Sequence, residues 1–163
     1  MAGEFSFDIV SQYDRQELVN AIDQANREIT TRYDLKATGS EVVLEKDSVQ
    51  LAADTDFTLK AVRELLVGKL VRRGLDTRIL DFGNVEPAAK GTVRQSAKLK
   101  EGIDAELARS VVKAIKDTNP KVRPTIQGDA VRVFGKVKDD LQKTIQTVKA
   151  KDWPAPLQFI NFR

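Results

Sequence analysis

Apolar and polar residues follow two periods in this chain, and the order of these periods predicts its elements. Residues 5–11 alternate with the period of two that is typical of a half-buried strand. After Asp14, apolar residues recur every three or four positions, which predicts a helix that ends near Tyr33. The rest of this first series is a predicted hairpin, a second helix and a closing strand, over residues 41–52, 56–74 and 77–81.

The same order of elements returns in the second part of the chain at a constant offset. The segment that begins at Asp47 (DSVQLAA) is echoed by the segment that begins at Asp129 (DAVRVFG), an offset of 129 − 47 = 82 positions. Leu59 and Leu141 have the same offset, 141 − 59 = 82. The second series is predicted as strand, helix, hairpin, helix and strand, around residues 92–100, 107–115, 122–135, 141–148 and 157–163.

Two series of this kind predict an α+β protein. Each has the βαββαβ order of a ferredoxin-like sandwich, in which two helices cover one face of an antiparallel sheet. Residues 82–91 carry two glycines, an asparagine and a proline, and they form the predicted connection. We therefore expect two tandem ferredoxin-like domains, over residues 1–85 and 86–163.

The face of each predicted sheet that carries no helix is the expected binding surface. Because side chains alternate along a strand, placing Val131 and Val133 in the core puts Arg132 and Phe134 outside. The same reasoning, applied to the strands over 92–100 and 157–163, completes the set of candidate nucleotide-binding residues: Arg94, Lys98, Arg132, Phe134, Phe159, Asn161 and Arg163. RNA-recognition domains stack bases on such rings and hold phosphates with such cations. In the alternative interpretation the two open faces pack on each other, and Phe134 and Phe159 are core residues between the domains.

The composition removes most catalytic chemistry. The chain has no cysteine and no histidine, so disulfides and thiolate nucleophiles are excluded and the most common general base and metal ligand is missing. Neither the phosphate-binding loop pattern Gly-x-x-x-x-Gly-Lys-Ser/Thr nor the dinucleotide pattern Gly-x-Gly-x-x-Gly is present. We expect a protein that is not an enzyme and that uses no cofactor and no metal ion. The lack of a long apolar run and of a signal-peptide pattern favours the cytoplasm and no membrane contact.

The net charge of +3 conceals an asymmetry between the two halves of the sequence. Residues 1–81 have 11 Lys and Arg against 15 Asp and Glu, whereas residues 82–163 have 16 against 9. The second half is therefore the one that we expect to attract an anion.

Four phrases of the sequence resemble the bacterial YajQ family. They are SFDIVS, AKLKEGID, IQGDAVRVFGKVKDDLQ and QFINFR, at residues 6–11, 97–104, 126–142 and 158–163. The resemblance runs from residue 5 to residue 163. It implies tandem ferredoxin-like domains whose first strands are exchanged, so that residues 5–11 join the sheet of the second domain and residues 92–100 join the first.

The resemblance also implies a function, which is nucleotide binding. Members are described as binding cyclic di-GMP and acting with a transcription regulator, and others as binding RNA or nucleoside triphosphates. The first hypothesis is therefore a cyclic di-GMP-type sensor that acts through a protein partner. The alternative is an RNA-associated protein that contacts single strands by charge and stacking. The usual RNA-recognition signature is missing, because residues 48–52 carry no aromatic ring and residues 131–136 carry one, Phe134. An enzyme ranks last.

Overall fold

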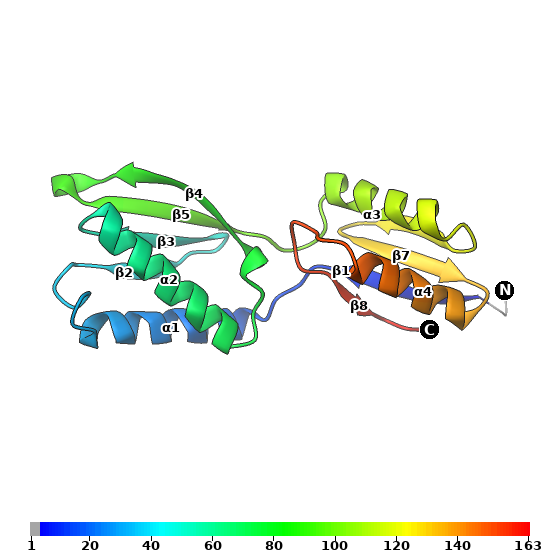
Figure 1. The fold of residues 1–163 in the computed structure, drawn as a ribbon, viewed down its shortest axis with the longest axis horizontal. Coiled ribbons are helices and arrows are strands. Elements are labelled where there is room, and N and C mark those ends of the chain that lie inside the picture. The colour runs from blue at the N-terminus through cyan, green and yellow to red at the C-terminus, as the bar shows by residue number, and fades with distance from the viewer. Residues whose placement is uncertain (1–3) are drawn as a thin grey trace. The chain divides into compact units, whose positions relative to one another are not determined.

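The computed structural model describes residues 4–163 and contains two compact units. One unit, here called the split unit, combines the described residues up to Gln12 with Glu101–Arg163, and the other, the continuous unit, is Tyr13–Lys100. Each unit has a four-stranded antiparallel sheet with two helices on one of its faces (Figure 1). The predicted α+β architecture of two ferredoxin-like sandwiches is confirmed.

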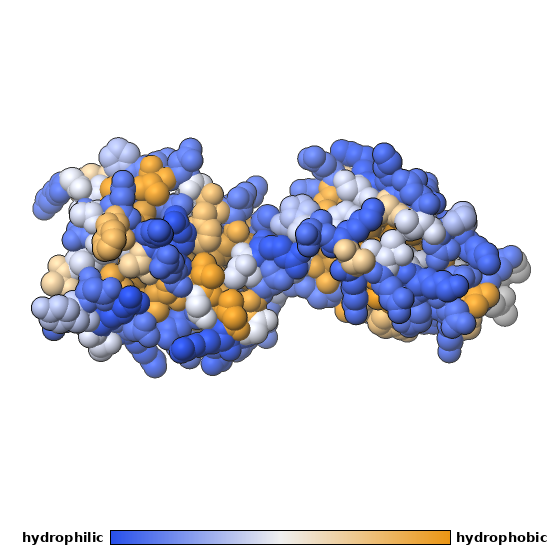
Figure 2. All heavy atoms as spheres, viewed as in Figure 1, coloured by the Kyte–Doolittle hydropathy of each residue, from blue (hydrophilic) through white to orange (hydrophobic). Residues whose placement is uncertain are grey.

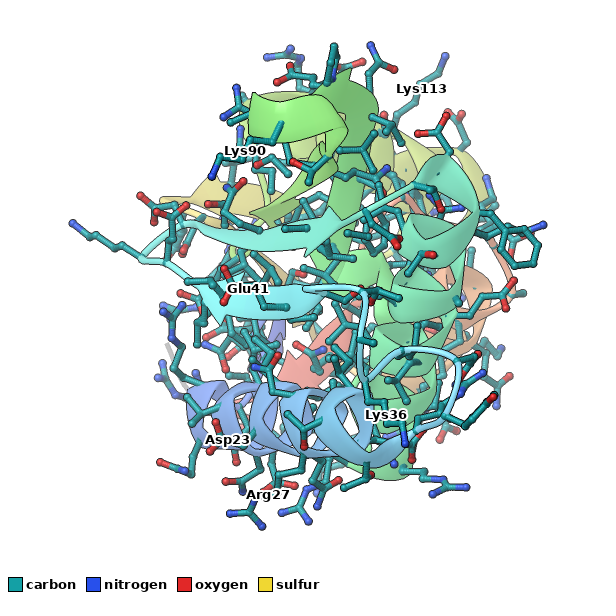
Figure 3. The ribbon with its side chains drawn as sticks, turned by 90° about the vertical axis from the view of Figure 1, so that its left-hand side faces the viewer. Asp23, Arg27, Lys36, Glu41, Lys90 and Lys113 are labelled. Carbon is teal, nitrogen blue, oxygen red and sulfur yellow. The ribbon has the colours of Figure 1, made fainter. Side chains whose placement is uncertain are left out.

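The continuous unit has the sheet order β2-β3-β5-β4. Its elements are α1 (Arg15–Thr31), β2 (Glu41–Leu44), β3 (Ser48–Ala53), α2 (Asp56–Arg72), a 3-10 turn at Thr77–Ile79, β4 (Leu80–Pro87), a second 3-10 turn at Ala89–Gly91, and β5 (Val93–Leu99). Leu18 of α1 and Leu66 of α2 pack on Val49 and Leu51 of β3 in its core. On the outer side of α1, Asp23 and Arg27 point away from the sheet (Figure 3).

The split unit has the sheet order β6-β7-β1-β8. Its elements are β1 (Phe5–Val10), α3 (Ala105–Thr118), β6 (Arg123–Gln127), β7 (Ala130–Gly135), α4 (Lys138–Lys149) and β8 (Gln158–Ile160). Its core joins Phe7 and Ile9 of β1 to Val111 of α3 and Ile145 of α4. The single tryptophan, Trp153, closes the end of α4 by donating its indole N–H to the carbonyl of Val148 at 2.8 Å.

Side-chain caps begin α1, α2 and α3, and a glycine follows the end of α2. Asp14 accepts hydrogen bonds from the backbone N–H groups of residues 16 and 17 and so begins α1, and Asp104 begins α3 in the same way. The cap of α2 is Thr55, with Asp56 in the first turn, where a carboxylate interacts favourably with the helix dipole. After α2 the chain turns at Gly74, whose φ of +78° suits a residue without a side chain. Every helix within residues 4–163 is too short or too polar to cross a bilayer.

β1 and β5, the first strands of the two βαββαβ series in the sequence, occupy central positions in the two sheets. β1 pairs with β7 and β8, and β5 pairs with β3 and β4, all antiparallel. Each unit therefore contains residues from both halves of the sequence, and the charges redistribute accordingly. The split unit has 12 basic against 10 acidic residues and the continuous unit has 15 against 14. The asymmetry between the sequence halves is thus not an asymmetry between the folded units, and only the local placement of charge distinguishes them.

Candidate functional site

The candidate site is the face of the split unit's sheet opposite α3 and α4, here called the split face. Directly opposed residues of antiparallel strands share a face, so the register arranges this surface in rows that cross the strands. The first row contains Arg123, Phe134, Ser6 and Arg163, and the second contains Thr125, Arg132, Asp8 and Ile160. Ser6 and Arg163 exchange two backbone hydrogen bonds, of 3.2 and 3.0 Å. The two rows thus carry three arginines, one aspartate and one aromatic ring.

Asp8 is the centre of the split face. It is only 6% exposed, yet its carboxylate is fully engaged. Arg132 donates Nε–H to Oδ1 at 2.8 Å and Nη2–H to Oδ2 at 3.3 Å, and Asn161 donates Nδ2–H to Oδ2 at 2.8 Å. A buried charge is tolerated only when it is paired and hydrogen-bonded in this way. Asp8 therefore fixes the positions of two of the predicted site residues.

These partners change the titration of the ion pair. The hydrogen bond from Arg132 lowers the pKa of Asp8 below its ordinary value, against the opposing effect of burial, and Asn161 and the charge of Arg163 lower the pKa further. Asp8 in turn raises the pKa of Arg132. Both groups are therefore held in their charged forms, and the guanidinium of Arg132 has a fixed orientation on the sheet.

Phe134 provides the aromatic surface of the split face. Its ring is half-buried, and the guanidinium carbon of Arg123 lies 4.6 Å from the ring centroid, within the range of a cation–π contact. Arg123 also lies 3.3 Å from Glu4, but its side chain is 61% exposed. The arginine is thus held over the ring without being withdrawn from solvent.

A one-residue bulge after β8 decides which terminal side chains reach the split face. Asp8 pairs with Ile160 and Ser6 pairs with Arg163, so two residues on the terminal segment oppose one residue on β1. Asn161 takes the extra position with a φ of +57°, a left-handed conformation that asparagine tolerates better than most residues. The bulge directs the Asn161 amide onto Asp8 and returns Arg163 to the same face.

The predicted orientation of Phe159 is wrong because of this bulge. Phe159 pairs with Ile9, so its ring lies on the helix-covered side, 6.0 Å from the ring of Phe7 and 5.6 Å from Nζ of Lys149 on α4. The prediction assumed an unbroken alternation in which Ile160 and Phe162 both face the core. Phe162 does so, with its ring stacked on Phe7 at 5.8 Å. With the extra residue in place, the assignments of positions 159 and 160 are exchanged.

The structure places Arg94 and Lys98 in the other unit. They lie on β5, on the helix-free face of the continuous unit's sheet, here called the continuous face. Arg94 forms an ion pair with Glu86 at 3.4 Å, and Lys98 is directly opposed by Ser48 and Asp81. The structure thus brings together Arg132, Phe134, Asn161 and Arg163 on one face.

Two charged residues of the split face, Asp8 and Arg123, are missing from the set predicted from the sequence. The single carboxylate of β1, between the apolar residues Phe7 and Ile9, is the signal for Asp8, because a buried acid requires partners. No group of three His, Cys, Asp or Glu side chains within residues 4–163 is arranged to hold a metal ion. The chemistry that the face offers is therefore charge pairing, ring stacking and hydrogen bonding.

Comparison with known proteins gives a consistent assignment over the whole chain. The family model described as "Nucleotide-binding protein YajQ-like" matches residues 5–163. Relatives called nucleotide-binding proteins occur in Synechococcus sp. (strain JA-3-3Ab) and Nostoc punctiforme, each 52% identical over 163 residues, and in Acaryochloris marina, 51% identical over the same length. In all three cases the alignment covers 100% of both chains. The chain belongs to the YajQ-like family of nucleotide-binding proteins.

Proposed function

We propose that this chain binds its nucleotide on the split face and that the ligand is a cyclic dinucleotide of the cyclic di-GMP type. The observation that carries the proposal is the convergence of Arg123, Arg132 and Arg163 around Phe134. Arginine pairs with phosphate through two parallel hydrogen bonds, and an aromatic ring stacks on a base. Both halves of a nucleotide therefore find partners within two rows of one sheet.

The exposed arginines are the proposed phosphate ligands. Arg123 is on the edge strand β6 and Arg163 lies beyond β8 at the other edge, three strand spacings or roughly 14 Å across the sheet. The guanidinium of Arg123 reaches inwards over Phe134, and the charge of Arg163 acts on Asp8. A cyclic dinucleotide carries two phosphates on opposite sides of its ring, so one ligand can engage both edges at once.

The base is assigned to the centre of the face. Phe134 offers a ring that already attracts the planar guanidinium of Arg123, and a guanine base can stack there in the same manner. Asn161 donates Nδ2–H to Asp8, and its Oδ1 makes no hydrogen bond to any residue in 4–163. That oxygen is the proposed acceptor for an N–H on the base edge. Arg132, fixed by Asp8, supplies a third charge beside it.

We also propose that the chain acts as a sensor rather than as an enzyme. A sensor transmits binding only when the ligand has unequal affinity for two states of the protein or of its complexes. The partner in this proposal is a transcription regulator, whose affinity for the chain changes when the cyclic dinucleotide is bound.

Calorimetric titration of the full chain with cyclic di-GMP tests the proposed site. Arg123→Ala and Arg163→Ala remove exposed side chains, and each is expected to weaken binding by about 1.5–3 kcal/mol for a charged hydrogen bond. Arg132 is not suited to this test, because its loss leaves the Asp8 carboxylate buried without its main partner. Arg94→Ala is the matched control, since it removes an exposed arginine from the same face of the other sheet. Equal affinity in all four proteins contradicts the proposed site.

Single-stranded RNA is the second candidate ligand, and the same observation favours it. A row of arginines with a ring between them can follow a nucleotide chain across a sheet. RNA binding differs in its dependence on salt, because each phosphate contact releases counterions and the affinity falls steeply as salt rises. Titration with a short RNA at two salt concentrations, beside cyclic di-GMP and GTP, separates the two ligand classes.

A further inference from the structure

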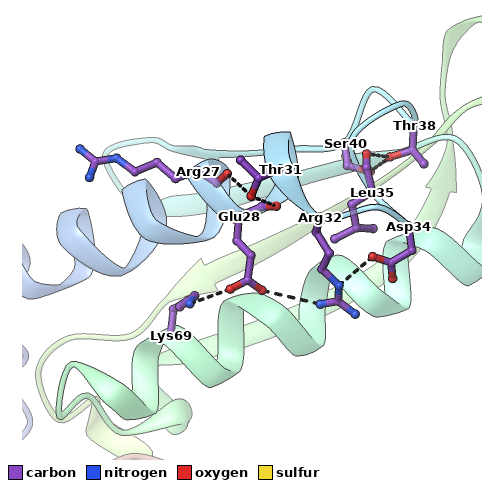
Figure 4. A network of polar contacts seen from close by, with 9 residues as sticks. All are labelled: Arg27, Glu28, Thr31, Arg32, Asp34, Leu35, Thr38, Ser40 and Lys69. Carbon is purple, nitrogen blue, oxygen red and sulfur yellow. Dashed lines mark hydrogen bonds and ion pairs between the residues drawn. The ribbon is translucent and has the colours of Figure 1, made fainter.

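A groove between α1 and α2 of the continuous unit is unrelated to the proposed nucleotide site. It has a volume of about 200 Å³ and is lined by Glu28, Glu64, Leu65, Gly68, Lys69 and Arg72. Glu28 of α1 links the two helices, because it accepts a hydrogen bond from Lys69 of α2 at 3.0 Å, and it also lies 3.8 Å from Arg32 (Figure 4). Hydrophobic residues are visible over this part of the molecule (Figure 2). The groove therefore combines an ion pair between its two helices with an apolar component.

Gly68 lies in the middle of the groove and has no local structural reason to be glycine. It occupies the interior of the 17-residue helix α2, where glycine is among the least favourable residues. Its φ is not positive, and a Cβ built on it would meet no atom within 4 Å. The missing side chain leaves a notch, through which another backbone can approach α2 closely.

The charges beside the notch have no partners among the described residues. Glu64 and Arg72 lie four residues before and after Gly68, which places them on the same face of α2, about 12 Å apart along its axis. Neither forms an ion pair or a hydrogen bond with any residue in 4–163. Next to them Val71 is 60% exposed, an apolar side chain without cover. The notch is thus flanked by one free anion and one free cation at equal spacing.

We propose that this face of α2 binds the same face of a second copy of the chain. When two identical helices cross antiparallel at Gly68, a two-fold axis passes through the notch. The arrangement brings Glu64 of each copy opposite Arg72 of the other and leaves Val71 of each copy near Leu65 of the other. The row at 64, 68 and 72 has the spacing of the ridges that interdigitate in the most common class of helix packing. The surface is therefore complementary to itself in charge and in shape.

Sedimentation velocity over a range of protein concentrations tests the proposal. The unaltered chain is expected to form a dimer as its concentration rises. Glu64→Arg places two arginines opposite each other at both contacts, and Arg72→Glu places two glutamates there, so each variant is expected to raise the dimer dissociation constant by about tenfold or more. Lys113→Glu is the matched control, because it reverses an exposed charge on α3 of the other unit and leaves the dimer unchanged (Figure 3).

Mixing the two variants gives the decisive result. Glu64→Arg carries only cations at the two positions and Arg72→Glu only anions, so an equimolar mixture restores both contacts and is expected to form a heterodimer. The double variant, in which both charges are exchanged, is expected to form a homodimer again. Circular dichroism checks that each variant is folded. A chain that stays monomeric at every concentration overturns the proposal, and so does a dimer that neither reversal weakens.

Discussion

The two sheets have the same strand topology, but their helix-free faces carry different side chains. In the split unit Arg132 of β7 is opposed by Asp8 of β1, and in the continuous unit Gln50 of β3 is opposed by Ser96 of β5. Both pairs are hydrogen-bonded, Arg132 to Asp8 at 2.8 Å and Gln50 to Ser96 at 2.9 Å. The same position in the fold thus holds an ion pair in one unit and a neutral pair in the other.

The neighbouring row shows the same contrast. Arg123 and Phe134 form an opposed pair in the split unit, and their counterparts in the continuous unit are Glu41 and Ala52. Over the two rows, the split face has three arginines and one aspartate, whereas the continuous face has one arginine, Arg94, between two glutamates. The fold therefore provides two similar sheet faces. Their side chains favour an anionic ligand on the split face and disfavour it on the continuous face.

Deleting residues 1–11 should have the largest effect on stability, and it should affect the split unit but not the continuous unit. The deletion removes the central strand β1 together with Phe7 and Ile9, both fully buried, and losses of about 3–5 kcal/mol are typical for one such phenylalanine. The split unit is expected to unfold, while the continuous unit keeps all its strands. Trp153 lies in the split unit, so tryptophan fluorescence reports the unfolding of that unit. Circular dichroism reports the helices and strands that remain in the continuous unit. A truncated chain whose tryptophan signal melts as in the intact protein contradicts this description of the sheet.

The fold was predictable from the sequence because the hydrophobic periodicity that predicts each helix or strand lies within that element. Apolar spacing gave the helices, and the offset of 82 positions between Asp47 and Asp129 gave the repeat. The two-residue turn Gly128-Asp129 even determines the register of its hairpin, and hence the pairing of Arg123 with Phe134. What no periodicity reveals is the sheet that a first strand joins, because an alternating strand fits either sheet equally well. That expectation came from the family resemblance alone.

Replacing Phe134 with Ala should have the second-largest effect, which is a loss of affinity for the nucleotide. If a base stacks on this ring, the variant loses about 1–3 kcal/mol of binding free energy. Phe159→Ala is the matched control, because its ring lies on the helix side beside Phe7. That variant is expected to lose up to about 3 kcal/mol of stability and to bind the ligand as the intact chain does while folded. Titration and thermal melting of both variants check the contrast, and unchanged affinity in Phe134→Ala would remove the ring from the site.

The candidate site was less predictable than the fold, since two of its features are not periodic. The left-handed Asn161 inserts one residue into the terminal segment, and this single insertion reverses the assignments of Phe159 and Ile160. Asp8 has an equally specific role, because its significance depends on Arg132 and Asn161, which are 124 and 153 positions away. Long-range pairing of this kind leaves no trace in local spacing.

Replacing Asp8 with Asn should produce a smaller effect that depends on pH. The folded pKa of Asp8 lies below its ordinary value of 3.8, so the carboxylate stabilises the fold above about pH 4, and this contribution is lost as the pH falls towards the folded pKa. Glu17 and Asp76 of the continuous unit also have lowered pKa values, but they are present in both proteins, so the difference between the intact chain and Asp8→Asn reports Asp8 alone. Denaturant unfolding followed by Trp153 fluorescence should show the intact chain more stable than Asp8→Asn at neutral pH. The two stabilities should converge in acid, and a difference that is constant from neutral pH to pH 3 contradicts the assignment.

Replacing Arg94 and Lys98 together with Ala should have the smallest effect, and it tests the continuous face directly. The side chains of Arg94 and its partner Glu86 are 62% and 61% exposed, and an ion pair at such a surface contributes about 0–1 kcal/mol to stability. The double variant is therefore expected to melt close to the intact chain. Its affinity for cyclic di-GMP should also be unchanged, because Glu41, Glu86 and Asp81 remain to repel a phosphate from this face. A clear loss of affinity would show that the continuous face contributes to nucleotide binding, and the contrast between the two sheet faces would then no longer account for the function.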